Sequence, residues 1–189
     1  QAVDLICTSE RKVHERYTIL LVGTFDSNKG QLELLHAVKR IIDTGRDLNC
    51  YLVGSDAGYL LACERFISLN KLESNVEVVP FTDSIQSFYL LSDVLVVCSG
   101  FETFGRVAVE AQKCGLPVIL SNVGANPERI QDGVNGLLYK KGDIDDLVYK
   151  IEILRNECKR NEFVAQIKQS ELDQYSIVNF ASQFYELLE

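Results

Sequence analysis

The chain has 189 residues, of which 47 % are hydrophobic, and a formal net charge of −8. This length allows one domain with a sizeable core. The negative charge argues against a general nucleic-acid or anionic-membrane surface, because such partners need a basic field, so any anionic ligand must be held locally. Neither a signal peptide nor an apolar run of about eighteen residues is apparent, so we expect no membrane span in this segment.

The chain is expected to start with a connecting segment, residues 1–16, that ends in a charged cluster, followed by one domain over residues 17–189. Strand-like runs are predicted at Thr18–Val22, Cys50–Val53, Val76–Val79, Val94–Cys98, Pro117–Leu120 and Gly136–Leu138. Helical runs alternate with them near 28–44, 57–70, 84–91, 104–114, 126–131 and 143–157, and two more are predicted near 160–170 and 176–188. This alternation predicts an α/β fold, a Rossmann-like parallel sheet of about six strands with helices on both faces.

Six cysteines occur without C-x-x-C spacing, at positions 7, 50, 63, 98, 114 and 158. Some of them lie in or beside apolar strand patterns, so we expect reduced core cysteines of a cytosolic protein. No Cys/His cluster has the spacing of a metal site, and no metal ion is implied.

The most informative segment is Ser99–Pro117, which follows the short buried strand predicted at Val94–Cys98 and leads through a turn into a helix. Such a turn leaves the first N–H groups of the helix unpaired, where the helix dipole favours an anion such as a phosphate. Gly105 would let that anion approach the backbone closely. Glu102 and Glu110 flank the turn with two carboxylates.

These residues resemble the E-x7-E signature of retaining glycosyltransferases of family four, which have the two-domain GT-B architecture. The resemblance is carried by Glu102, Phe104-Gly105, Glu110-Ala111 and Gly115-Leu-Pro-Val118, and extends over residues 17–189 through Val22-Gly23, Lys29-Gly30, Tyr51–Gly54, Asn75–Phe81, Pro127-Glu128, Asp132–Gly136 and Tyr175-Ser176. It implies the carboxyl-terminal, donor-binding half of a cytoplasmic enzyme. The amino-terminal, acceptor-binding half would be missing, and any peripheral membrane attachment would come through it.

The resemblance also implies roles for single residues. Glu110 would accept the ribose hydroxyls of the nucleotide, and Glu102 would contact the transferred sugar as the catalytic carboxylate. The remaining donor-binding positions are Gly23, Thr24 and Lys29 for the diphosphate, the backbone of Thr103, Phe104, Gly105 and Arg106 for the phosphates, and Pro80 and Phe81 for the base.

Simpler interpretations remain open for several of these residues. Lys29, expected just inside a helix capped by Ser27 or Asn28, could be a solvated lysine. Glu110 could form a surface pair with Arg106, four residues earlier on the same helix face. Phe81 and Phe104 could be core residues.

The chain departs from the family at Thr24, where an arginine commonly follows the glycine and contacts the diphosphate. A hydrogen bond to a charged group is worth roughly 1.5–3 kcal/mol. We therefore expect that Thr24 and backbone amides compensate, that donor binding is weak, or that the donor is not an ordinary nucleoside diphosphate sugar.

We expect a domain that binds a nucleoside diphosphate sugar and, in the full-length protein, supports hexosyl transfer to an acceptor with retention. The donor is the only small-molecule partner implied, and no cofactor is expected. The isolated chain should fold but not transfer sugar. The alternatives are a nucleotide-sugar epimerase of the same architecture and a non-catalytic sugar-nucleotide-binding or scaffolding module.

Overall fold

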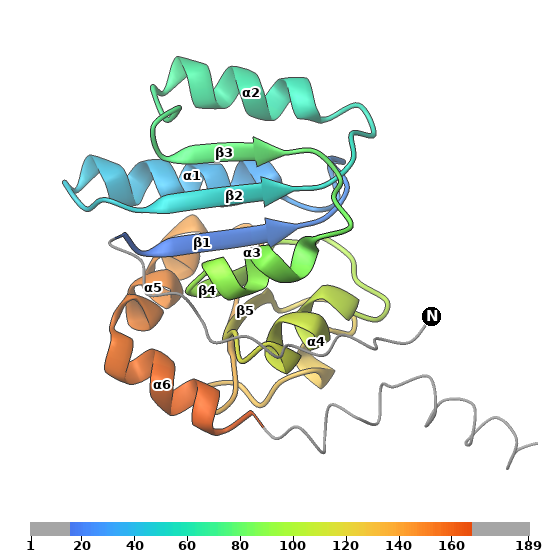
Figure 1. Cartoon of the computed structure of the whole chain (residues 1–189), viewed down its shortest axis with the longest axis vertical. Coiled ribbons are helices and arrows are strands. Elements are labelled where there is room, and N and C mark those ends of the chain that lie inside the picture. The colour runs from blue at the N-terminus through green and yellow to red at the C-terminus, as the bar shows by residue number, and fades with distance from the viewer. Residues whose placement is uncertain (1–15, 168–189) are drawn as a thin grey trace, which may run out of the picture.

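A computed structural model describes residues 16–167 of the chain and shows one six-stranded parallel sheet (Figure 1). The strands are β1 (Thr18–Val22), β2 (Asn49–Val53), β3 (Val76–Val79), β4 (Val94–Val97), β5 (Val118–Ser121) and β6 (Leu137–Tyr139). Their order is β3-β2-β1-β4-β5-β6, and every neighbouring pair is parallel. The predicted Rossmann-like fold is confirmed.

Helices cover both faces of the sheet. They are α1 (Gln31–Asp43), α2 (Leu60–Leu69), α3 (Ile85–Leu91), α4 (Arg106–Lys113), α5 (Ile144–Arg155) and α6 (Glu157–Ala165), with a 3₁₀ turn at Asn126–Glu128. Side chains of a strand alternate between its faces. Accordingly, Ile19 and Leu21 belong to the core cluster that contains residues of α1 and α5, whereas Leu20 belongs to the cluster that contains residues of α3 and α4.

The strand order reverses between β1 and β4, because β1 pairs with β2 on one side and with β4 on the other. The helix that follows β1, α1, lies on one face of the sheet, and α4, which follows β4, lies on the opposite face (Figure 1). In open α/β sheets the loops at such a reversal diverge and leave a crevice at the carboxyl ends of the strands, where ligands bind. The fold therefore brings the loops after β1 and β4 together at this edge.

The start of α1 differs from the prediction of a helix near 28–44. The helix begins at Gln31, because Gly30 adopts a left-handed conformation with φ 69°. The Asp26 carboxylate accepts the N–H groups of Asn28 and Lys29 at 2.7 and 3.0 Å and forms a turn ahead of the helix. Lys29 is thus outside the helix, and the predicted caps at Ser27 or Asn28 are wrong.

The chain after β5 also differs in part from the prediction. Instead of a helix over 126–131 there is only the three-residue 3₁₀ turn. The helix predicted near 160–170 begins earlier, at Glu157, since the Asn156 side chain caps it by accepting the N–H of Lys159 at 3.1 Å. The helix predicted near 176–188 and nearly all of the connecting segment lie outside the described residues.

The cysteines follow the prediction only in part. Cys50, Cys63 and Cys98 are buried free thiols, and burial raises the pKa of Cys63 to about 11 and of Cys98 to about 12. Cys158 is free but exposed, and Cys114 is disulfide-bonded. The expectation of reduced core cysteines is therefore wrong for these two.

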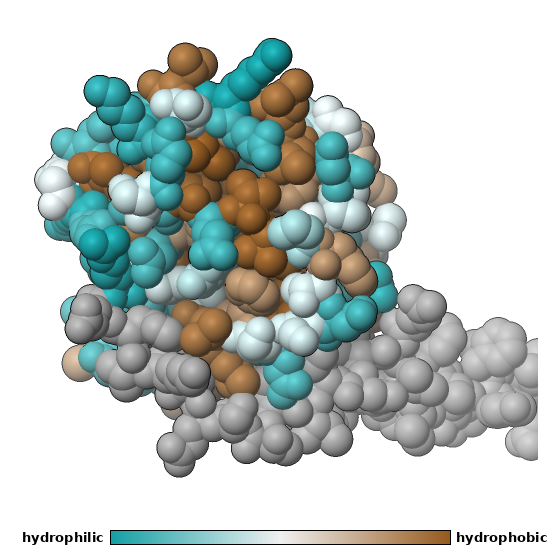
Figure 2. Space-filling model, turned by 45° about the horizontal axis from the view of Figure 1, so that its top comes forward, coloured by the Kyte–Doolittle hydropathy of each residue, from teal (hydrophilic) through white to brown (hydrophobic). Residues whose placement is uncertain are grey.

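Some large hydrophobic side chains are exposed at the surface. On the face shown in Figure 2, hydrophobic residues form a band with hydrophilic residues on either side. Within residues 16–167, three of the exposed large hydrophobic residues, Phe81, Phe101 and Phe104, lie in the loops after β3 and β4. These three therefore border the edge at which the loops meet. Over the same range, none of the helices combines the length and the apolar character needed to cross a bilayer.

Candidate functional site at the carboxyl edge of the sheet

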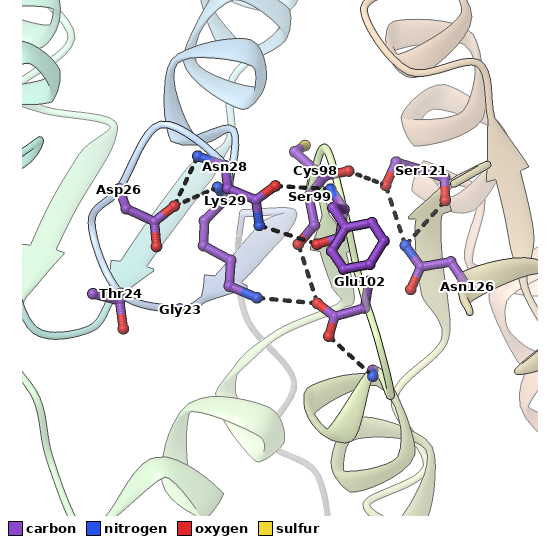
Figure 3. A network of polar contacts seen from close by, with 12 residues as sticks. Gly23, Thr24, Asp26, Asn28, Lys29, Cys98, Ser99, Glu102, Ser121 and Asn126 are labelled. Atoms are coloured by element: carbon purple, nitrogen blue, oxygen red, sulfur yellow. Dashed lines mark hydrogen bonds and ion pairs between the residues drawn. The ribbon is translucent and has the colours of Figure 1, made fainter. Parts of the chain in front are cut away.

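Asn28 joins the loop after β1 to the loop after β4 (Figure 3). Its side chain accepts the N–H of Phe101 at 2.8 Å and donates to the carbonyl of Phe101 at 3.0 Å. Its main-chain carbonyl accepts the N–H of Gly100 at 2.6 Å. Three hydrogen bonds from one residue therefore fix the relative position of two loops that are 73 residues apart in sequence. The sequence analysis missed this role, for which the only signal was an asparagine next to Lys29.

Lys29 and Glu102, the two residues adjoining this connection, form an ion pair. The Nζ of Lys29 lies 3.0 Å from Oε2 of Glu102, and the side chains are 29 % and 12 % exposed (Figure 3). The same oxygen accepts the hydroxyl of the buried Ser99 at 3.3 Å, and Oε1 accepts the N–H of Gly105 at 3.2 Å. The lysine is thus not simply solvated; it forms a pair with the predicted catalytic carboxylate.

The environment of Glu102 stabilises its ionised form. Burial opposes ionisation, but the Lys29 ammonium and the N–H groups of Gly105 and Phe104 outweigh it, so the pKa of Glu102 lies below its ordinary value. The carboxylate is therefore negatively charged at neutral pH. It contacts one cation and two backbone amides, the kinds of group that bind anions in proteins.

The start of α4 depends on Gly105, which adopts a left-handed conformation with φ 71° directly before the first helical residue. A Cβ at this position would lie 3.5 Å from Oδ1 of Asn126, a buried oxygen that has no hydrogen-bond partner among the described residues. The Asn126 amide group donates to the carbonyl and hydroxyl oxygens of Ser121 at 3.0 and 3.1 Å. Asn126 thus ties the loop after β5 to the end of that strand, and the N–H of Ala125 links the same loop to the carbonyl of Glu102 at 2.8 Å.

The two residues before Gly105 are exposed at the edge of the site. Thr103 is exposed, and Phe104 is 37 % exposed with the Arg129 guanidinium 4.6 Å from its ring centroid. Such a cation–π contact is worth about 0.5–1 kcal/mol at an exposed position. Phe104 is therefore not a core residue, and its ring lies beside a cation.

A pocket of about 420 Å³ opens beside this network. Its walls come from the ends of β1 and β2, the loop after β3 and the first turns of α4. The lining residues are Val22, Gly23, Thr24, Val53, Gly54, Ser55, Phe81, Thr82, Asp83, Ile85, Arg106, Val107 and Glu110. Arg106 is the only lysine or arginine in this lining. The volume is within the range of sites for small organic ligands.

The structure divides the predicted site residues into two groups. Gly23, Thr24, Phe81, Arg106 and Glu110 line the pocket, whereas Lys29 and Glu102 form the adjoining ion pair. Thr103, Phe104 and Gly105 form the turn before α4, and Pro80 is exposed next to the pocket residue Phe81 without lining the pocket itself. Phe81 is 71 % exposed, so it is not a core residue.

Glu110 has a partner that the sequence analysis missed. The hydroxyl of Tyr89, a side chain that is 0 % exposed, donates to Oε2 of Glu110 at 2.7 Å. No ion pair between Arg106 and Glu110 occurs in residues 16–167, so the simple surface pair is not formed. Tyr89 gave no sequence signal beyond its place in an apolar helical run.

Within the described part of the chain, no group of three or more His, Cys, Asp or Glu side chains could hold a metal ion. This edge carries two features: the Lys29 ammonium and turn N–H groups, which bind the Glu102 carboxylate, and the pocket with Glu110 in its wall. One carboxylate belongs to each of these two features.

Comparison with known proteins gives the family of the chain. Residues 5–170 match the family model for glycosyl transferases group 1. An uncharacterized glycosyltransferase of Methanocaldococcus jannaschii is 40 % identical over 141 residues, which cover 73 % of this chain and 38 % of that protein. The chain therefore belongs to the glycosyl transferases group 1 family, and it spans well under half the length of this relative.

Solved structures agree with this assignment. The crystal structure of Anabaena HepE in complex with UDP-glucose matches with a TM-score of 0.82 and 27 % identity, covering 92 % of this chain and 49 % of that one. The C-terminal domain of a group 1 family glycosyltransferase from Francisella tularensis matches in fold with a TM-score of 0.76 and 23 % identity, covering 85 % of this chain and 87 % of that one. The sheet thus corresponds to one half of a GT-B glycosyltransferase.

Proposed function

We propose that residues 17–189 are the donor-binding domain of a retaining glycosyltransferase that transfers a hexose from a nucleoside diphosphate sugar to an acceptor. The observation that carries the proposal is the arrangement of the edge. The pocket with Glu110 in its wall lies next to the ion pair of Lys29 and Glu102. The loop after β1 contributes to both features, since Thr24 lines the pocket and Lys29 belongs to the ion pair. A nucleoside diphosphate sugar needs such a pair of neighbouring sites.

Each part of the donor has a matching group. The Glu110 carboxylate would accept the ribose hydroxyls, and the exposed ring of Phe81 would form an apolar wall for the base. The Lys29 ammonium, the Arg106 guanidinium and the amides of the turn before α4 would hold the diphosphate. These groups would stabilise the charge that develops on the leaving diphosphate during transfer. Glu102 would then act on the transferred sugar at the boundary between the two sites.

Arg106 is relevant to the departure at Thr24. Both residues line the pocket, and Arg106 forms no ion pair among the described residues. A cation on the first turn of α4 could therefore supply the charge that an arginine at position 24 would bring. On this basis Thr24 does not preclude binding of an ordinary donor.

The comparisons support the choice of donor and of domain. The HepE crystal structure contains UDP-glucose, and the Francisella tularensis structure is a C-terminal domain on its own. By this proposal the acceptor is held by an amino-terminal domain outside this chain. The chain alone should then bind the donor without transferring its sugar at the rate of an intact enzyme.

The test is isothermal titration calorimetry of the chain with UDP, ADP and GDP and with the matching monophosphates and nucleosides. We expect one diphosphate to bind more tightly than its monophosphate and nucleoside. Glu110→Gln should weaken its binding by about 1–3 kcal/mol, roughly 5- to 150-fold, because a charged acceptor is lost. Glu64→Gln, which removes the same charge from the exposed face of α2, should have no effect.

Two results would contradict the proposal. Absence of binding by every nucleotide would reject the donor site, and rapid sugar transfer by the chain alone would reject its role as half of an active site. If a diphosphate binds but the intact protein lacks transferase activity, the scaffolding alternative becomes the better account.

A further inference from the structure

Tyr89 approaches the pocket from behind. Its ring is completely buried in the core cluster between the sheet and α4, together with Leu20 and Ala108. It does not line the pocket, but its hydroxyl donates to Oε2 of Glu110, which does. Because the ring is fixed by packing, the position of the hydroxyl is also fixed. The bond therefore restricts the rotation of the Glu110 carboxylate.

The chemistry of this pair leaves Glu110 able to bind a ligand. An ionised carboxylate has about four acceptor sites on its two oxygens, and the Tyr89 hydroxyl takes one of them. The hydroxyl is a neutral donor, so it does not cancel the charge of Glu110. Burial and the neighbouring carboxylate raise the pKa of Tyr89, which keeps the hydroxyl protonated as a donor. Oε1 and the remaining site on Oε2 stay available to two further donors.

Two adjacent hydroxyl groups of a ribose fit this acceptor arrangement. A flexible glutamate would lose rotamer freedom when it binds a diol, and that loss weakens binding. A carboxylate already held by Tyr89 does not incur the same loss on binding. The benefit is greatest for a ligand that uses both oxygens, and a nucleotide without the 2′-hydroxyl can use only one.

A purely structural explanation would be that Glu110 is present to satisfy a buried tyrosine hydroxyl. Any acceptor would serve that purpose, including a main-chain carbonyl. The structure contains such a structural pair for comparison: Tyr139, which is 1 % exposed, donates to Oε1 of Glu33 at 2.9 Å, and neither residue lines the pocket. The two pairs differ in whether the carboxylate faces the pocket.

We propose that Tyr89 is a positioning residue that orients Glu110 toward the ribose and so gives the site a preference for ribonucleoside diphosphates over their 2′-deoxy counterparts. This inference rests on the proposed function, because it assumes that Glu110 faces a nucleotide. It adds to the proposed function a residue outside the pocket that controls how Glu110 meets the ribose, and the preference for the ribonucleotide that follows from it.

The experiment measures the affinities of UDP and 2′-deoxy-UDP, and of the ADP and GDP pairs, for the chain and for Tyr89→Phe. We expect the chain to favour the ribonucleotide, and Tyr89→Phe to reduce that preference by roughly 3- to 10-fold, the scale for immobilising one flexible side chain on binding. The reduction should arise from weaker binding of the ribonucleotide. Tyr139→Phe, the matched control, should leave the preference unchanged even where it lowers the melting temperature.

The remaining outcomes separate this inference from the proposed function. If a ribonucleoside diphosphate binds and Tyr89→Phe weakens both members of a pair equally, the tyrosine has only a structural role and this inference is overturned. It is also overturned if the unsubstituted chain shows no preference for the ribonucleotide.

If Tyr89→Phe fails to fold, a second variant takes its place. Glu110→Asp keeps the charge but moves it away from Tyr89, so it must reduce the preference for the ribonucleotide. An unchanged preference overturns the inference. If no nucleoside diphosphate binds, the proposed function fails and this inference with it.

Discussion

Lys29 and Glu102 meet at 3.0 Å although 73 residues separate them in sequence. The pair links the loop after β1 to the loop after β4 at the point where the strand order of the sheet reverses. Each partner is also held by its own loop, Lys29 through Asp26 and Glu102 through the turn at Gly105. The two charges are thus placed by the fold, and the variants below test what each contributes.

Glu102→Gln should change how stability depends on pH. The pKa of Glu102 is lowered in the folded state, so its charge stabilises the protein above the unfolded pKa, near 4.5, and this contribution is lost as the pH falls through the lower folded pKa. We compare the free energy of unfolding of the unsubstituted chain with that of Glu102→Gln. The difference should be constant above about pH 5. Below about pH 4.5 the unsubstituted chain should progressively lose stability relative to the variant. Urea denaturation between pH 3 and 7 measures it.

In a Lys29→Ala background the same comparison should show a weaker pH dependence, because the ammonium that lowers the pKa is gone. A difference that moves in favour of the unsubstituted chain as the pH falls would mean that the folded pKa of Glu102 is raised.

Lys29→Ala should weaken binding of the diphosphate identified by calorimetry by about 1.5–3 kcal/mol, the scale of a hydrogen bond to a charged group. Binding of the nucleoside alone should change little, because Lys29 lies beside the pocket and not in its lining. Lys39→Ala removes a lysine that pairs with Asp43 on α1 and serves as the control. Equal loss for nucleoside and diphosphate would place Lys29 near the base or ribose instead.

Thr24→Arg should tighten diphosphate binding, because it adds a cation to a wall of the pocket in an otherwise acidic protein. The gain should be larger for the diphosphate than for the monophosphate and should shrink as salt rises. Repulsion from Arg106, which lines the same pocket, will limit it. Ser74→Arg adds the same charge at the amino-terminal end of β3 and should give no gain; an equal gain there would indicate only a change in net charge.

Gly30→Ala should destabilise the fold more than Gly45→Ala does. Both glycines have positive φ, 69° and 81°, and the conformational cost of alanine is about 1 kcal/mol at each. At Gly30 the new Cβ would also lie 2.2 Å from the carbonyl oxygen of Cys98, whereas nothing lies within 4 Å at Gly45. We expect an additional loss of about 1–3 kcal/mol for Gly30→Ala in urea denaturation, from the scale of overpacking. Equal losses of stability for the two variants would mean that the chain at Gly30 moves away from Cys98 easily enough to accommodate the new Cβ.

The sequence predicted the sheet well because its strands are short apolar runs that are buried on both faces. The starts of two helices were harder. The left-handed Gly30 and the turn at Asp26 delay α1, and the Asn156 side-chain cap starts α6 early. The sequence pattern predicts a longer helix where only the 3₁₀ turn at Asn126 forms, because the burial of that side chain among Ser121 and Gly105 is a tertiary property.

The site was predicted as a set of residues but not as a set of contacts. The motif identified Glu102 and Glu110, yet it could not show that one pairs with Lys29 and the other with Tyr89. The alternative of a surface pair between Arg106 and Glu110 followed from helix spacing alone, and the structure shows Glu110 bonded to the buried tyrosine of α3 instead. Tyr89 lies in an apolar run and is a core residue, so only the direction of its hydroxyl reveals a second role.

Asn28 has a consequence for how this edge can move. A side-chain amide that both donates to and accepts from the main chain of Phe101 imitates a peptide unit, so the loops after β1 and β4 are paired again beyond the point where the two strands separate. Lys29 follows Asn28 directly, and Glu102 follows Phe101. The two charged residues therefore directly follow the residues that these hydrogen bonds join, and a motion that draws the charges apart has to strain or break those bonds.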